Sequence, residues 1–166
     1  MKSNDLVNLM FSPQWISTLL HHFISGAEKV NAQGIKTEIL YLVIPFVTDD
    51  VTNGILSNAN IRSNFSSIFY KKASSEKRIP LDVKNSLMGK NNQIEQYREI
   101  TNRGFIYLGN TVTLEIGKYI TVAKTIEYKY EKGINRDYCK AAYNLGVVLA
   151  KEDYRNVFVK LGITNI

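Results

Sequence analysis

The chain has 166 residues, of which 45% are apolar, and its formal net charge at neutral pH is +6. This length and apolar content predict one folded domain with a sizeable core and exclude a chain that is disordered over most of its length. One cysteine, Cys139, excludes an internal disulfide framework and a cysteine-rich zinc site.

The modest positive charge permits contact with DNA or with an acidic protein without requiring either. The ten tyrosines suit a protein interface as well as a core with hydrated edges. No secretory signal is visible, and the apolar run 39–47 is too short to span a bilayer. We therefore expect a cytoplasmic protein with no membrane partner.

Residues 5–30 predict one long helix, or two helices with a break at Ser12–Pro13. Ser12 can cap the second helix, and Pro13 fits its first turn. The following apolar run, 35–57, shows no alternation and favours a buried helix that Pro45 breaks or kinks.

Asp49–Asp50 is expected to open a further short helix that ends near Leu56. Beyond it, residues 61–70 predict a helical segment whose core face includes Ile61 and Phe65. The N-terminal part of the chain, about 5–70, is therefore expected to be helical.

A charged connector follows at 71–78, with one acidic residue among four basic ones. The basic residues are Lys71, Lys72, Lys77 and Arg78. We expect a mobile surface connector, and the alternative is an electrostatic contact with DNA or with an acidic coiled coil. The absence of aromatic side chains in the connector argues against base stacking.

Residues 81–104 predict a helix that Gly89 can interrupt and Arg103–Gly104 ends. Residues 105–108 and 112–116 are expected to be strands, and Gly117–Lys118 is expected to turn the chain into a hairpin. Helices that run into a hairpin follow the order of a winged helix, so a winged-helix-like part is expected over about 80–123.

Four basic residues of this part could contact DNA from the helix and the wing, namely Lys90, Arg98, Arg103 and Lys118. Three glutamates interleave with them, whereas a recognition helix presents a cleaner basic face. A solvated face or a protein-docking face is therefore favoured over direct DNA contact. Residues 124–134, which contain Tyr128 and Tyr130, predict either an extra strand or an extended arm.

The sequence shows no combination of residues that is typical of a catalytic or metal-binding site. The only histidines, His21 and His22, are adjacent, so they cannot chelate a metal as an i, i+4 pair does, and one is expected at the core edge and the other in solvent. Cys139 is expected to pack as a small apolar residue, and nothing in the sequence enforces its proximity to a histidine. We expect no enzymatic activity, no cofactor and no metal.

Residues 136–163 predict two amphipathic helices separated by Glu152–Asp153, and Gly162 ends the second. The first helix carries small residues that let another element approach closely, which is a docking pattern rather than a catalytic one. The candidate docking residues of this segment are Tyr138, Ala141, Ala142, Leu145, Gly146, Phe158 and Leu161, to which the arm adds Tyr128 and Tyr130.

This C-terminal pattern resembles that of the middle components of bacterial three-component ABC systems, a group that includes the small third subunit of Lamassu-type antiphage complexes. The matching residues are Ala141, Ala142, Leu145, Gly146, Leu149, Ala150, Lys151, Phe158, Leu161, Gly162 and Ile163. The resemblance implies two partners, which are an SMC-like or Rad50-like ABC ATPase and an effector. In Lamassu-type assemblies the effector is a nuclease that stays inactive until foreign DNA is sensed. The resemblance also implies that this chain is a non-catalytic subunit that bridges the two partners. Any contact with DNA is then made through the complex.

The expected fold is mainly α with a small β-hairpin, in one α+β domain over 1–166. Two other functions stay open at this point. One is a winged-helix DNA-binding protein or transcriptional regulator, and the other, disfavoured by the missing acid–base and metal sets, is a small enzyme.

Overall fold

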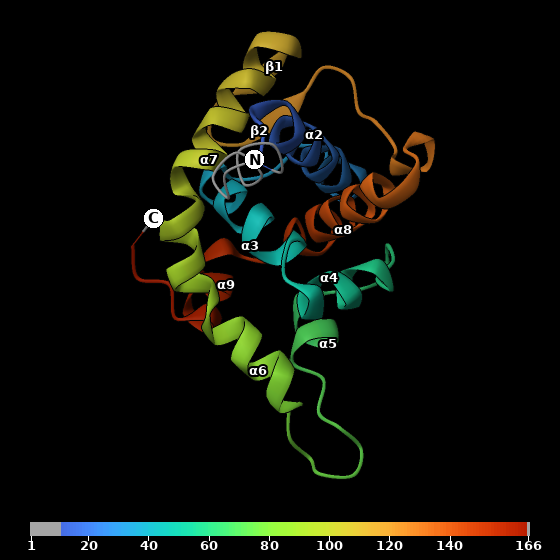
Figure 1. Ribbon diagram of the computed structural model, residues 1–166, viewed down its shortest axis with the longest axis vertical. Helices are drawn as coiled ribbons and strands as arrows, with labels where there is room; N and C mark the ends of the chain where they lie inside the picture. Colours follow the sequence, from blue (N-terminus) through green and yellow to red (C-terminus); the bar gives the residue numbers. More distant parts are fainter. Residues whose placement is uncertain (1–10, 166) are drawn as a thin grey trace, which may run out of the picture.

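The computed structural model describes residues 11–165, which are mainly helical with a small two-stranded sheet (Figure 1). The expected mainly helical α+β class is therefore confirmed. The elements in chain order are α2 (Pro13–Val30), the 3-10 helix η1 (Thr37–Leu42), α3 (Val43–Val47), α4 (Asp50–Ser57), α5 (Phe65–Phe69), α6 (Leu81–Met88), α7 (Lys90–Thr111), β1 (Leu114–Ile116), β2 (Ile120–Val122), the 3-10 helix η2 (Tyr128–Tyr130), α8 (Gly133–Leu149) and α9 (Tyr154–Leu161).

Helices α2 and α8 are in direct backbone contact through two glycines. A Cβ atom on Gly146 of α8 would overlap the carbonyl oxygen of Phe23 and lie 2.9 Å from the backbone nitrogen of Ala27. A Cβ atom on Gly26 of α2 would overlap the carbonyl oxygen of Tyr143 in the same way. The two helices approach this closely only because each carries a glycine at the crossing.

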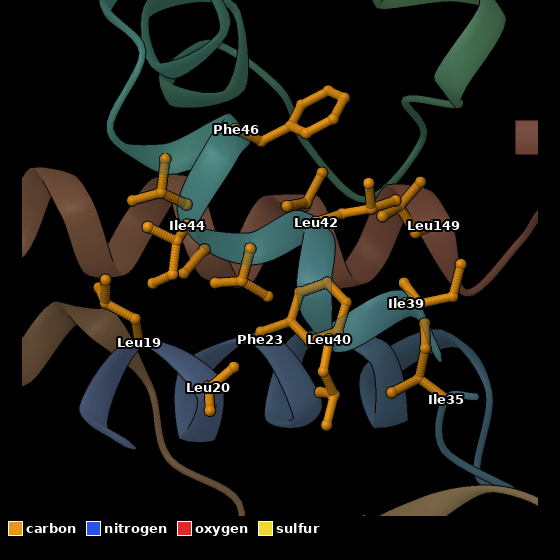
Figure 2. Close-up of a cluster of buried hydrophobic side chains, with 14 of the residues drawn as sticks. Leu19, Leu20, Phe23, Ile35, Ile39, Leu40, Leu42, Ile44, Phe46 and Leu149 are labelled. Atoms are coloured by element: carbon orange, nitrogen blue, oxygen red, sulfur yellow. The ribbon is translucent and has the colours of Figure 1, made fainter. Parts of the chain in front are cut away.

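The core fills the space around α2 and α8. Figure 2 shows the segment 35–47 lying alongside the two helices, with Phe46 directed away from both. Leu40, Leu42, Ile44 and Phe46 are at most 2% exposed, like Phe23 of α2. The apolar run is buried as predicted, but it forms η1 and α3 in place of one helix. Pro45 lies in the first turn of α3, where no intrahelical partner for its missing N–H is needed.

Helix starts follow the predicted caps. The Ser12 hydroxyl accepts a hydrogen bond from the Trp15 N–H (3.2 Å), and the Asp49 carboxylate accepts from the N–H groups of Val51 and Thr52 (3.0 and 3.1 Å). Asp153 opens α9 in the same way. Gly162 ends α9 with a φ of +67°, as the sequence predicted. The part of the expected first helix before residue 11 lies outside the described residues.

The predicted strand at 105–108 is wrong, because α7 continues through it to Thr111. Gly104 does not end the helix; it is buried where a Cβ atom would overlap the side chain of Ile16 on α2. The predicted break at Gly89 is confirmed, as it separates α6 from α7. A glycine that permits close packing therefore looked, in the sequence, like a helix terminator.

The predicted hairpin is confirmed in shorter form. Strands β1 and β2 pair antiparallel, with Glu115 opposite Thr121. On its other side β2 forms a bridge with Ile35, which attaches the hairpin to the loop after α2. The described elements do not show a winged-helix core.

One further expectation is corrected, and one choice between two alternatives is decided in favour of an arm. Ile61 was assigned to a core face but is 52% exposed, because the helix in that region, α5, starts only at Phe65. Residues 124–132 form no strand; they run as an arm that contains η2, and the N–H of Ile126 donates to the Ser25 hydroxyl (3.0 Å).

No single helix within residues 11–165 has the length and apolar character needed to cross a membrane. Thr37–Val47 and Asp50–Ser57 meet those criteria only when taken together, and they are bent by 104° at their junction.

We expect Gly146→Ala to lower the free energy of unfolding by about 3 kcal/mol or more, because the new methyl group must push α2 and α8 apart. The matched control is Gly54→Ala in α4, where no described atom lies within 4 Å of an added Cβ. This variant should gain about 0.5 to 1 kcal/mol from the better helix propensity of alanine. Urea unfolding of both variants checks the prediction, and a Gly146→Ala protein as stable as the wild type would contradict it.

Candidate partner-docking surface

The small residues predicted to dock a partner are buried inside this chain. Ala141, Ala142 and Leu145 are 0% exposed, and Gly146 is buried against α2. Helix α8 packs against α2, α4 and α3, so a partner cannot reach these buried side chains. The expectation that these four residues form a docking surface is corrected, because the close approach they allow is intramolecular.

The aromatic and C-terminal candidates are distributed between core and surface. Tyr138 packs edge-on against Trp15, and Tyr128 packs edge-on against Tyr143, with ring centroids 5.5 and 5.4 Å apart. Leu161 is only 4% exposed, and Phe158 is half-buried. By contrast, Tyr130 is 84% exposed. Of the predicted docking residues, Tyr130 is therefore the one that projects fully into solvent.

Sequence reasoning missed a groove between α6 and α9. It has a volume of about 480 Å³, and its lining includes Met88 and Val159, which are 68% and 80% exposed. Leu87 lines the same groove and is buried, while Lys84 and Lys160 also belong to the lining. Among the described residues that line it there is no acidic side chain. The groove therefore combines exposed apolar side chains with positive charge.

A second exposed apolar region lies at the start of α8. Tyr130 is joined there by Ile134, which is 76% exposed. A pocket of about 250 Å³ in the same region is lined by Tyr128 and Tyr143 and also by Ile61. Figure 1 shows η2 and the start of α8 on the opposite side of the molecule from α9, so the two apolar regions are well separated.

The predicted DNA-contact residues do not form one basic face. Lys71, Lys72, Lys77 and Arg78 are exposed on a turn that the Ala73 N–H closes by donating to the Arg78 carbonyl (2.7 Å). This turn leads directly into α6, which borders the apolar groove.

The other basic candidates lie elsewhere. Lys118 is exposed at the tip of the hairpin. On α7, the guanidinium of Arg98 pairs with Glu95 (2.5 Å), and that of Arg103 pairs with Glu99. The interleaved glutamates therefore neutralise both arginines, so α7 offers no strongly basic surface to a phosphate backbone.

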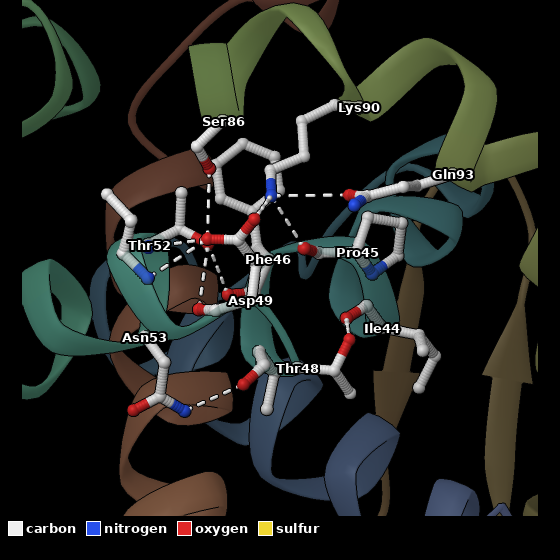
Figure 3. A network of polar contacts seen from close by, with 12 residues as sticks. Ile44, Pro45, Phe46, Thr48, Asp49, Thr52, Asn53, Ser86, Lys90 and Gln93 are labelled. Carbon is white, nitrogen blue, oxygen red and sulfur yellow. Dashed lines mark hydrogen bonds and ion pairs between the residues drawn. The ribbon is translucent and has the colours of Figure 1, made fainter. Parts of the chain in front are cut away.

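Lys90 is wholly buried, which corrects its assignment as a DNA contact. Figure 3 shows its ammonium group between α7 and the segment 45–49. The Nζ atom donates to the Pro45 carbonyl (2.8 Å), pairs with Asp49 Oδ2 (3.2 Å) and lies 5.0 Å from the centre of the Phe46 ring. A lysine can be buried in this way because a carboxylate and a carbonyl replace its hydration.

Burial and ion pairing shift the pKa values of both Lys90 and Asp49. Burial lowers the pKa of Lys90, and the charge of Asp49 opposes that shift. Burial alone would raise the pKa of Asp49, but hydrogen bonds from the Thr52 N–H and the Ser86 hydroxyl, together with the charge of Lys90, outweigh it, so the pKa is lowered. Asp49 thus serves both as the cap of α4 and as the counter-ion that ties α7 to it.

The histidines differ in burial as expected, but both lie deeper: His22 is wholly buried, and His21 is half-buried beside the Lys124 carbonyl (2.8 Å). Cys139 is also buried as expected, and burial together with the nearby Glu131 charge raises its pKa to about 12. The structure nevertheless brings Cys139, His22 and Glu131 together. No local sequence signal could have predicted this, since α2, the arm and α8 are far apart along the chain.

A family model now gives these observations a context. The model of Middle Component 3 of ABC-three component (ABC-3C) systems matches residues 1–165. The chain belongs to this family. No curated protein and no solved structure gives a significant match. A middle component of an ABC-3C system has protein partners in its complex, which accords with exposed apolar surfaces on a well-packed domain.

We expect Lys90→Ala to lower the free energy of unfolding by about 3 to 5 kcal/mol, because it leaves Asp49 and the Pro45 carbonyl without their partner. Lys90→Met should lower the free energy of unfolding by less, since methionine keeps most of the buried volume. Lys84→Ala, at an exposed position on α6, is the control and should stay within about 0.5 kcal/mol of the wild type. Urea unfolding measures all three, and a neutral Lys90→Ala would exclude a structural role for the pair.

Asp49 should also make stability depend on acid pH. Because its pKa is lower in the folded state than the ordinary value of 3.8, its contribution is complete above that value and disappears as the pH falls through the folded-state pKa. The stability difference between wild type and Asp49→Asn should therefore stay constant from neutral pH to about pH 5 and shrink below about pH 4. Thermal melts of both proteins across this pH range measure that stability difference. A difference that stays constant throughout would contradict a lowered pKa for Asp49 in the folded state.

Proposed function

We propose that this middle component is a non-catalytic accessory subunit that bridges an SMC-like ABC ATPase and an effector. The observation that supports this most strongly is the presence of two exposed apolar regions on opposite sides of one compact domain. A bridge needs two separate contact surfaces, and a domain with capped helices, a packed core and small residues used internally can hold them at a fixed separation.

We assign the α6–α9 groove to the ATPase. Met88 offers an adaptable apolar contact and Val159 a rigid one, and the lysines of the lining add positive charge. The basic turn 71–78 extends this charge toward α6. An apolar segment with acidic flanks, such as one face of a coiled coil, complements this combination, because opposite charges guide the encounter and apolar contacts hold the complex.

We assign the region around Tyr130 and Ile134 to the effector. Tyr130 projects from an arm that is held just before it, by the hydrogen bond between Ile126 and Ser25 and by the packing of Tyr128 on Tyr143. A tyrosine held in this way loses little conformational entropy on binding and can bury its ring while its hydroxyl stays hydrogen-bonded.

In this proposal the complex works like the Lamassu-type antiphage assemblies that the C-terminal sequence resembles. The ATPase senses foreign DNA, and the effector, a nuclease, stays inactive until that signal arrives. The ATPase can bias the effector only if the contacts made through this subunit differ between the inactive and active arrangements. Loss of either contact should therefore release the effector prematurely or uncouple it from sensing.

Co-expression with the neighbouring genes and purification through a tag on this chain test the bridge. The wild type should recover an ABC ATPase and a second subunit. Val159→Glu places a charge in the groove and should lose the ATPase but keep the effector, whereas Tyr130→Ala should lose the effector but keep the ATPase. Loss of a buried aromatic anchor weakens binding by about 2 kcal/mol, or roughly 30-fold.

Two controls separate docking from folding. Asn156→Glu adds the same charge to an exposed position of α9 outside the groove, and Lys129→Ala truncates the exposed neighbour of Tyr130. Both should retain both partners. A wild-type chain that elutes alone, or variants that all recover both partners, would refute the bridging role.

The basic turn is tested with Lys71→Glu combined with Lys77→Glu. Loss of ATPase recovery at low salt supports an acidic protein partner. Unchanged ATPase recovery with loss of salt-sensitive duplex-DNA binding would assign the turn to nucleic acid instead.

A further inference from the structure

Three side chains with metal-binding atoms converge beneath the arm. His22 comes from α2, Glu131 directly follows η2, and Cys139 comes from α8. One ligand atom from each residue lies within 4.8 Å of the other two. His22 Nε2 and Glu131 Oε1 are 3.3 Å apart. His22 and Cys139 are buried, while the Glu131 side chain is 31% exposed and leaves a way in from solvent.

The protein alone does not satisfy the buried imidazole. Among residues 11–165, the Nδ1 atom of His22 has no hydrogen-bond partner. If Nε2 carries the proton and donates to Glu131, Nδ1 is a buried lone pair without a donor. If Nδ1 carries the proton, the Nε2 lone pair faces a carboxylate oxygen, which is repulsive unless a cation lies between them. A metal ion bound to Nε2 and Oε1 removes that repulsion and fixes the proton on Nδ1, which then needs a water molecule as its acceptor.

The donor set indicates zinc. Nitrogen, sulfur and carboxylate oxygen are the three ligand types that Zn²⁺ uses in proteins, and a thiolate disfavours Mg²⁺ and Ca²⁺. Zn–N and Zn–O bonds at a tetrahedral angle place those two atoms about 3.3 Å apart. The His22–Glu131 separation of 3.3 Å has this value, which a direct hydrogen bond between the two groups also gives, and the Cys139 sulfur lies within 4.8 Å of both atoms. Three protein ligands leave a fourth position for water.

The carboxylate is oriented by a chain of hydrogen bonds behind it. Glu131 Oε2 accepts from Asn135 Nδ2 (3.0 Å), and Asn135 Oδ1 accepts from Trp15 Nε1 (3.0 Å). This leaves Oε1 directed to His22. Ligands of protein metal sites are held by partners of this kind, which contribute to affinity by fixing the ligand orientation.

We propose that His22, Glu131 and Cys139 bind one Zn²⁺ ion. On binding, the Cys139 thiol releases its proton to solvent and its sulfur forms a bond to the metal, with no oxidation or reduction. The bound ion joins α2, the arm and α8, so it fixes the segment that carries Tyr130. This inference does not depend on the bridging function.

Cobalt substitution tests the site in the full-length protein without a histidine tag. One equivalent of Co²⁺ per chain should produce a thiolate-to-cobalt charge-transfer band and the visible absorption of a tetrahedral ion, and Zn²⁺ should displace both. Cys139→Ser should lose the charge-transfer band while its circular dichroism spectrum stays native. Glu131→Gln, at a partly exposed position, should bind Co²⁺ at least about tenfold more weakly.

His21→Gln is the matched control, because it removes the neighbouring histidine and should leave both the spectrum and the affinity unchanged. The proposal is overturned if the wild type shows no charge-transfer band, or if folded Cys139→Ser and Glu131→Gln bind Co²⁺ as the wild type does. The three side chains would then be a packed cluster only.

Discussion

The backbone contact between α2 and α8 is the constraint on which the rest of the fold depends. Gly26 and Gly146 let the two helices touch, and the segment 35–47 then packs into the space beside them. The same contact brings His22 of α2 next to Cys139 of α8. α7 reaches the other side of α2 through a third close approach, at Gly104 and Ile16. Backbone proximity, more than any polar interaction, therefore sets the positions of the three long helices.

This constraint explains what the sequence could and could not predict. Ser12, Asp49 and Asp153 act as helix caps because capping depends on residues a few positions apart, which a sequence displays directly. The small-residue face of α8 was also visible, but its partner was not. Periodicity identifies an apolar face without saying whether another chain or a distant helix of the same chain covers it, and here α2 covers it.

The remaining errors have the same origin. Gly104 looked like a helix end because glycine often is one, whereas its missing side chain serves the contact with Ile16. Lys90 looked exposed because lysine usually is, whereas Asp49 and the Pro45 carbonyl replace its hydration. The exposed pair Met88 and Val159 was not singled out from the sequence, because apolar periodicity does not mark positions that stay exposed. Each case depends on a neighbour that is distant along the chain.

For the proposed bridging role, the architecture favours a rigid connection over a hinge. One continuous unit of α2, α7 and α8 connects the α6–α9 groove with the arm, and close-packed interiors transmit displacement without deforming. A subunit of this kind relays position between two partners. Any switch must then lie in the contacts at its two ends, where the turn 71–78 and the arm 124–132 are the least enclosed segments. The arm is the more constrained of the two, because one hydrogen bond to Ser25 and packing on Tyr143 hold it, so the proposed effector side is pre-organised and the proposed ATPase side is freer to adapt.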